Sequence, residues 1–227
     1  MQTVQPSLSN RFRKRNPFYG ISLTYSGKYL ESPTLLVPQT GPFTVEFWVY
    51  DRSTSSSYVE FISCPLSGKM FYVGKIINTQ NLRFSLCGVQ GGVSGFNVPL
   101  NTWSHIAISY DGANTFSAYL NGILVFTTTN GTHDTASGSA TRIGRQFSPY
   151  NEYCDSIISE IKIWDVIRTQ AEIHQDMFNA QKNNNFLYYI DMSRYGSGSL
   201  VTSPLGKNQA TFTYNGIDTD ISTSDHP

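Results

Sequence analysis

Apolar and polar residues alternate along much of the chain, which is the pattern of half-buried β-strands rather than of helices. The clearest case is residues 43–50. One side of this segment is wholly apolar and is formed by Phe43, Val45, Phe47 and Val49. The other side is polar or amphipathic and is formed by Thr44, Glu46, Trp48 and Tyr50. The segment is therefore predicted to be a strand with its first side in a core. Its second side is expected to face solvent, a ligand groove or an overlying loop.

Residues 98–126 are predicted to form three consecutive antiparallel strands. The first turn falls at Asp111–Asn114, where Asp, Gly and Asn tolerate left-handed backbone conformations. The second turn, Asn121–Gly122, is a strong hairpin signal because a type I′ turn needs positive φ at both central residues. Three strands cannot bury their apolar side alone, so a second sheet is expected to pack on them.

Further strands are predicted from the same alternation at 58–64, 70–76, 82–87, 141–145, 157–164, 186–192 and 210–214, with a first pair within 21–38. In the segment 157–164, one side is expected to hold Ile157, Ser159, Ile161 and Ile163, and the other Glu160, Lys162 and Trp164. The glycine-rich residues 91–95 are expected to be a flexible connection. A capping box formed by Thr169 and Glu172 predicts one short helix from Gln170 to about Asn183.

The length of 227 residues fits one large all-β domain over residues 17–217, preceded by a flexible basic arm, 1–16, and followed by a loose acidic tail, 218–227. The formal net charge of zero argues against nucleic acid as the main partner. No apolar run has the length of a signal peptide or a transmembrane helix, so membrane insertion is not expected. The three cysteines are too few for a disulfide framework and are predicted to be buried free thiols, with one bridge as the alternative: Cys64, Cys87 and Cys154.

Several of these segments together resemble one known family. They are FTVEFWV at 43–49, WSHIAISYDG at 103–112, AYLNG at 118–122, RIG at 142–144, SEIKIW at 159–164 and RTQAEI at 168–173. In this order they resemble the laminin G-like, concanavalin A-like lectin/glucanase superfamily, from about Tyr25 to Ile173. The resemblance implies a jelly-roll β-sandwich of two antiparallel sheets with one short helix near the C-terminus. Ser159 stands where the family commonly has Asp, so no charge or metal role is carried over to that position.

Catalysis is not favoured by the positions of the acidic residues. Glycoside hydrolysis needs two carboxyl groups on either side of the scissile bond. Glucanases of the superfamily carry them on one strand as Glu-x-Asp-x-(x)-Glu, whereas Lys162 stands at an acidic position here and Asp165 is out of phase. Glu46 and Glu60 are the remaining pair that could meet, across neighbouring strands. The chain is therefore interpreted as non-catalytic, with a glycoside hydrolase as the least favoured alternative.

Glycan binding is the favoured function, because a sugar is recognised by an aromatic surface surrounded by polar side chains. The residues expected to line one concave sheet are Glu46, Trp48, Tyr50, Arg83, Trp103, His105 and Tyr119. The alternative is that Trp48 and Trp103 only pack under loops. A second candidate site lies in a loop with Tyr150, Asn151 and Tyr153. Calcium, which the resemblance implies and which prefers oxygen ligands, would bind Asp111, Asn114, Glu152 and Asp155.

The sequence thus predicts a recognition domain that binds glycans or glycoproteins on a cell or particle surface. The main alternative is a structural component of a virion, tail fibre or surface layer, in which the basic arm and acidic tail contact neighbouring subunits. That alternative predicts a homo-oligomer or a larger assembly.

Overall fold

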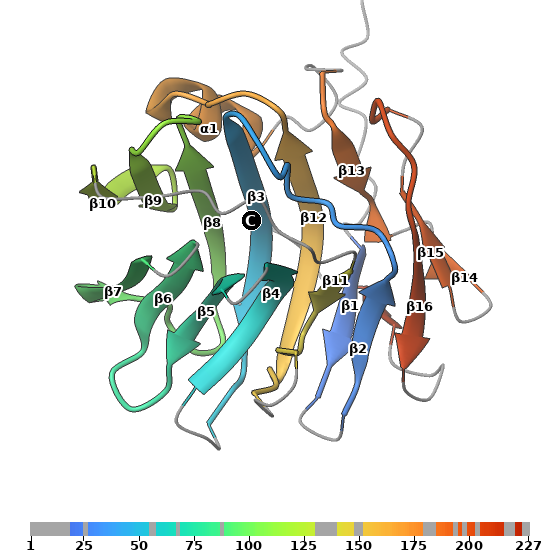
Figure 1. The fold of residues 1–227 in the computed structure, drawn as a ribbon. Coiled ribbons are helices and arrows are strands. Elements are labelled where there is room, and N and C mark those ends of the chain that lie inside the picture. Colours follow the sequence, from blue (N-terminus) through green and yellow to red (C-terminus); the bar gives the residue numbers. More distant parts are fainter. Residues whose placement is uncertain are drawn as a thin grey trace, which may run out of the picture.

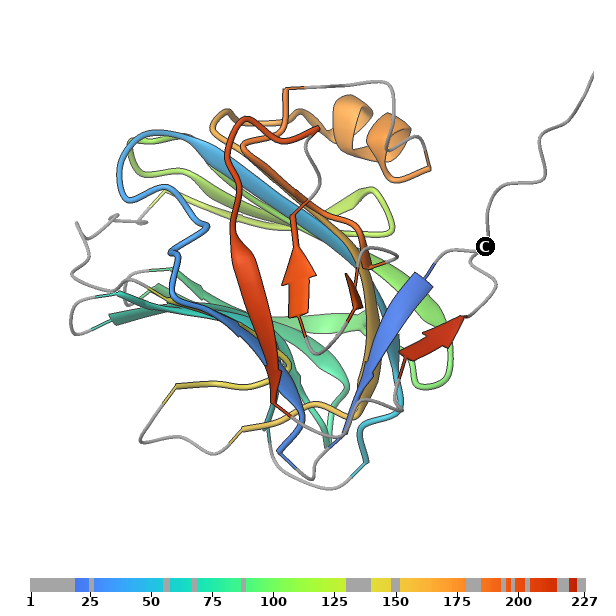
Figure 2. The same ribbon diagram turned by 90° about the vertical axis from the view of Figure 1, so that its right-hand side faces the viewer.

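In the residues that it describes, a computed structural model shows two antiparallel β-sheets packed face to face, with one short helix outside them (Figures 1 and 2). It describes residues 19–24, 27–54, 58–66, 69–86, 89–129, 140–147, 152–178, 185–192, 195–196, 199–202, 205–215 and 221–223. The predicted β-sandwich is confirmed. The predicted basic arm, the loop residues Tyr150 and Asn151, and the third cysteine, Cys87, lie outside the described residues.

Sheet A has the strand order β10-β9-β8-β3-β12-β1-β17, and β13 pairs with the second half of β12. Its strands are β1 (Tyr19–Leu23), β3 (Phe43–Asp51), β8 (Trp103–Tyr110), β9 (Phe116–Leu120), β10 (Ile123–Thr128), β12 (Ser156–Trp164), β13 (Tyr188–Ile190) and β17 (Ile221–Thr223). The predicted three-stranded meander is therefore β8, β9 and β10, and Asn121 and Gly122 both have positive φ in its second turn.

Sheet B has the order β14-β15-β16-β2-β11-β4-β5-β6-β7. Its strands are β2 (Tyr29–Ser32), β4 (Tyr58–Leu66), β5 (Lys69–Ile76), β6 (Asn81–Leu86), β7 (Val89–Asn97), β11 (Thr141–Ile143), β14 (Tyr195–Gly196), β15 (Ser199–Val201) and β16 (Thr211–Asn215). Strands β4 to β7 follow one another along the chain and in the sheet, so residues at matching alternate positions share one surface.

The core lies between the two sheets and is formed by the apolar sides that the alternation predicts. Phe47 of β3 contacts Phe61 of β4 with ring centroids 6.1 Å apart, and Phe43 contacts Phe71 of β5 at 5.9 Å. Both pairs are edge-to-face and join sheet A to sheet B. Cys64 and Cys154 are buried free thiols, as predicted for these two cysteines.

A β-bulge in β12 changes which of its residues face the core. Ser159 is opposite Trp48 and Lys162 is opposite Glu46, so two residues of β12 stand against one of β3. Glu160 has a φ of 48° at this position. The expectation that Ile157 and Ser159 share one side with Ile161 and Ile163 was therefore wrong. Ile158 is in the core instead, and the phase is restored at Ile161 and Ile163.

Two other segments differ from the predictions. Residues 91–95 belong to strand β7 rather than to a flexible connection. Residues 221–223, within the predicted acidic tail, form β17 and pair with β1. The predicted helix is present as α1 (Gln170–Asp176) and begins with the predicted capping box of Thr169 and Glu172. It ends before Asn183, and residues 179–184 are not described.

Candidate functional site

The centre of the outer side of sheet A is covered by α1 (Figure 2). Ile173 of the helix packs on Ala107 and Tyr119. Nε1 of Trp48 donates a hydrogen bond of 3.0 Å to the carbonyl oxygen of Met177, just after the helix. A helix, rather than the loop that the alternative interpretation expected, therefore covers Trp48. Four of the residues that were expected to line a groove are buried: Glu46, Trp48, His105 and Tyr119.

Ionisable groups are enclosed beneath this helix. Burial raises the pKa of Glu46 to about 8, although the ammonium group of Lys162 acts in the opposite direction. Nε2 of His105 lies 3.1 Å from Oε2 of Glu46, and burial holds the pKa of His105 well below its usual value. Nζ of Lys162 donates to the carbonyl oxygen of Asp176 at 2.7 Å. The cluster therefore supports the docking of α1 and is closed to a ligand.

Tyr50 and Trp103 lie on the same side of sheet A, beyond the helix, and are half-buried. Their rings make an edge-to-face contact with centroids 5.7 Å apart. Arg52 follows on this side and pairs with Asp155 at 2.9 Å. These two aromatic residues are the part of the predicted groove that α1 leaves open.

The four predicted metal ligands have different surroundings. Oδ1 of Asp111 accepts hydrogen bonds from the amides of Ala113, Asn114 and Thr115 in its own turn. Burial alone would raise the pKa of Asp111, but these bonds lower it to about 2. Asp155 pairs with Arg52, and Glu152 pairs with Arg83. Within the described ranges no three His, Cys, Asp or Glu side chains form a group that could hold a metal ion. Calcium binding stays a prediction.

Arg83 lies on sheet B and not with the other predicted residues. It belongs to β6 and stands in register with Gly74 of β5, which in turn stands opposite Glu60 of β4. Nη1 of Arg83 reaches Oε1 of Glu60 at 3.1 Å and Oε2 of Glu152 at 2.8 Å.

Two tyrosines enclose this guanidinium group. Its central carbon lies 4.1 Å from the ring centroid of Tyr58 and 4.4 Å from that of Tyr72. Such cation–π contacts hold an arginine in a fixed orientation. The Arg83 cluster is formed by Tyr58, Glu60, Tyr72, Arg83 and Glu152.

The two carboxyl groups of the Arg83 cluster differ in their surroundings. Glu60 is fully buried, and this burial raises its pKa well above the usual value even though Arg83 acts to lower it. The side chain of Glu152 keeps 15% of its surface exposed. Arg83 thus lies within ion-pair distance of both carboxyl groups, and Glu152 is the one that keeps contact with solvent.

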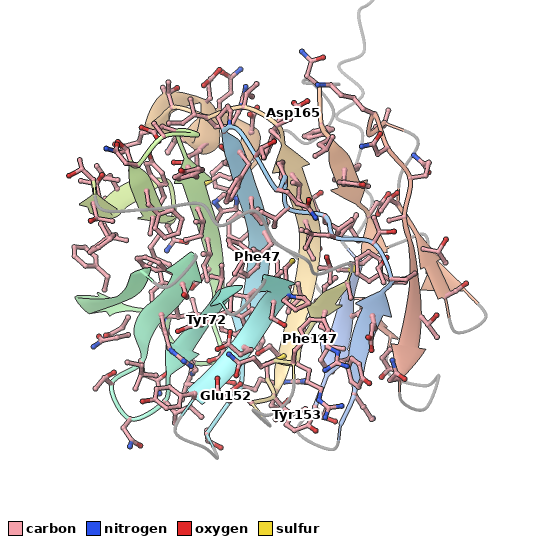
Figure 3. All side chains as sticks on the ribbon, viewed as in Figure 1. Phe47, Tyr72, Phe147, Glu152, Tyr153 and Asp165 are labelled. Atoms are coloured by element: carbon pink, nitrogen blue, oxygen red, sulfur yellow. The ribbon has the colours of Figure 1, made fainter. Side chains whose placement is uncertain are left out.

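A second group of arginines lies on the same side of sheet B. Arg142 of β11 packs on Phe147 at 4.1 Å and Tyr29 at 5.1 Å, and Arg145 packs on Tyr29 at 5.0 Å and Tyr153 at 4.8 Å. These five residues form the Arg142 cluster. The Arg142 cluster adjoins the Arg83 cluster, because Arg142 of β11 and Tyr72 of β5 lie opposite the same residue of β4, one on each side of that strand. Figure 3 shows side chains of both clusters in the lower half of the sandwich, at the end away from Asp165.

Only part of this surface was predicted from the sequence. Arg83, Glu152 and Tyr153 were expected in separate groups, and Glu60 only as a possible acid. Six further residues of the surface were not predicted: Tyr29, Tyr58, Tyr72, Arg142, Arg145 and Phe147. Alternation in β4, β5 and β6 already places Tyr58 with Glu60, and Tyr72 with Gly74, on the polar side. Pairing these three strands as consecutive hairpins would have brought them to Arg83.

The structure also rules out the remaining possibility that Glu46 and Glu60 meet. Glu46 lies on the outer side of sheet A beneath α1, and Glu60 lies on the outer side of sheet B. The whole core separates them, so they cannot flank one glycosidic bond. Within the described ranges, no helix is long and apolar enough to cross a membrane.

Comparison with known proteins agrees with this architecture. The chain is similar over 92% of its length to a Bacteroides ovatus protein that is assigned a carbohydrate-binding role, with 18% identity and a TM-score of 0.72. It spans 61% of that protein. A heptameric SAP-like pentraxin from Limulus polyphemus matches 70% of this chain and 82% of its own, with 17% identity and a TM-score of 0.58. Domain 4 of the arabinanase AbnA from Geobacillus stearothermophilus, solved with arabinotriose, matches 62% of this chain and 68% of its own, with 16% identity and a TM-score of 0.50.

These likenesses establish the jelly-roll fold, and their low identities carry no further conclusion. No curated protein gave a significant match. A family model, by contrast, matches residues 24–174, which is most of the chain and nearly the segment that the motifs indicated. The chain belongs to the concanavalin A-like lectin/glucanases superfamily.

Proposed function

We propose that this protein is a non-catalytic domain that binds glycans through the outer side of sheet B. The observation that carries the proposal is the set of three arginines on this side, each packed on aromatic rings: Arg83, Arg142 and Arg145. Aromatic rings offer a surface for the C–H side of a sugar ring, and arginines and carboxylates bind its hydroxyl groups.

Exposure also favours sheet B over the centre of sheet A. Tyr58 is 39% exposed, and Tyr29, Phe147 and Tyr153 are half-buried. On sheet A the corresponding central aromatic residue, Trp48, is only 3% exposed. The carbohydrate-binding assignment of the Bacteroides ovatus protein, and the arabinotriose in the complex with domain 4 of AbnA, support the same class of ligand.

A hydrolase is less well supported by this site. Glu60 and Glu152 are the two carboxyl groups that this site would offer as an acid and a base. Glu60, however, is fully buried beneath the Arg83 cluster, so a glycosidic oxygen has no access to it.

Glycan-array binding with the purified chain, with and without calcium, tests the proposal. Tyr58→Ala and Phe147→Ala should each weaken binding about tenfold, because stacking aromatic residues dominate such contacts. Tyr50→Ala and Trp103→Ala are matched controls on sheet A and should leave binding unchanged. If the controls lose binding and the sheet B variants keep it, the ligand lies on sheet A.

Two further results would contradict the proposal. Release of reducing sugar from a bound glycan would show catalysis. A silent array, together with a closed oligomer in light scattering, would favour the structural alternative.

A further inference from the structure

We propose that Arg83 is a receptor for the carboxylate of an acidic sugar, and that Glu152 occupies this receptor in the free protein. The inference rests on the proposed function, because it assigns a ligand class to the same surface.

Groups on the neighbouring strands hold the guanidinium group of Arg83 in one orientation, which suits the binding of a carboxylate. Tyr58 and Tyr72 lie within 4.4 Å of its guanidinium carbon, and Glu60 contacts it from the buried side. Tyr72 belongs to β5, the strand next to β6, and Tyr58 and Glu60 belong to β4 on the far side of β5. An arginine that is already oriented loses little side-chain entropy when a carboxylate binds.

Glu152 differs from these groups because it comes from the segment between β11 and β12 rather than from a strand. Its carboxylate lies 2.8 Å from Nη1 of Arg83. The place of a carboxylate ligand is thus filled by a carboxylate of the chain itself. A sugar acid that displaced it would exchange one negative charge for another, so no charge would be left buried without a partner.

Glu60 supports Arg83 from the buried side and is out of reach of a ligand, since its side chain is fully buried. The exposed ring of Tyr58 lies over the same guanidinium group and offers a surface for the sugar ring. The arginine and the aromatic ring together favour a sugar acid over its neutral counterpart.

The proposal is tested by isothermal titration calorimetry with a galacturonic acid trisaccharide and the matching galactose trisaccharide. Wild type should bind the acidic sugar more tightly, and added salt should reduce the difference. Glu152→Gln removes the competing carboxylate and should tighten the acidic sugar about tenfold without changing the neutral one. Arg83→Lys should remove most of the preference for the acidic sugar.

Glu31→Gln is the matched control. Glu31 pairs with Arg142 on the same side of sheet B at 3.3 Å, so this variant removes a carboxylate from the other arginine cluster. It should leave the difference between the two sugars unchanged. Circular dichroism and the melting temperature check that each variant is folded.

The outcomes separate this inference from the proposed function. Equal binding of the two sugars by wild type, lost in Tyr58→Ala, would overturn the acidic receptor and leave glycan binding intact. Unchanged or weaker binding of the acidic sugar by folded Glu152→Gln would show that Glu152 only fixes its segment to the sheet. Failure of both sugars to bind, when other glycans bind on the array, would overturn the ligand class alone.

Discussion

Glu46 provides a direct test of the buried cluster beneath α1. Its carboxyl group has a pKa of about 8 in the folded protein against 4.5 as an ordinary side chain. Between these values the folded state keeps a proton that the unfolded state releases. The stabilising contribution of this proton is complete below pH 4.5 and is lost as the pH rises toward 8. Replacing Glu46 by glutamine removes the titration and keeps the shape.

The size of the effect follows from these two values. Each pH unit inside the interval is worth about 1.4 kcal/mol. From pH 5 to pH 7, the unfolding free energy of wild type should therefore fall by about 2.5 kcal/mol relative to Glu46→Gln. Groups common to both proteins cancel in this difference.

Urea denaturation of both proteins at pH 5, 6, 7 and 8 measures this difference. Glu172→Gln is a control in which the stability should depend on pH in the opposite direction, because a hydrogen bond from the Thr169 amide lowers the pKa of Glu172. The stability that Glu172 contributes should be lost as the pH falls, and its variant should lack that loss. A difference between wild type and Glu46→Gln that does not change with pH would refute the reasoning. It would mean that Glu46 is ionised and paired with Lys162.

Three further substitutions and one labelling experiment test the packing of the sandwich and the cap of its helix. Gly74→Ala should destabilise the protein by about 3 kcal/mol in urea denaturation, since a Cβ there would overlap the carbonyl oxygen of Val59; an unchanged midpoint would contradict this. Phe47→Ala should cost about 3–5 kcal/mol by the same measurement, because the side chain is fully buried between the sheets. Thr169→Ala should cost about 1 kcal/mol through loss of the helix cap. Cys154, whose pKa is raised by burial, should react with a thiol reagent only on unfolding, and rapid native labelling would argue against its burial.

Local signals in the sequence predicted the local structure correctly. The alternation at residues 43–50 gave the core side of β3, because a strand places alternate side chains on opposite sides wherever its sheet lies. The pair Thr169 and Glu172 gave the start of α1, because both hydrogen bonds of a capping box lie within four residues.

Features that depend on distant partners were not predictable in this way. The bulge at Glu160 has no local signal, and it moved Ile158 into the core in place of Ile157 and Ser159. The segment 91–95 looks like a connection because of its glycines, yet it pairs with β6. In each case the deciding information lies in the neighbouring strand.

The same reason explains why the candidate site moved from one sheet to the other. The sides of β3 and β4 that the sequence pattern indicates as polar have similar residues, since both carry an acidic and an aromatic side chain. Their difference is that Lys162 and Trp48 donate hydrogen bonds to the carbonyl oxygens of Asp176 and Met177. These two bonds fix the C-terminal end of α1 over the centre of sheet A. Polar residues there hold a helix, and we therefore place the proposed glycan site at the Arg83 and Arg142 clusters.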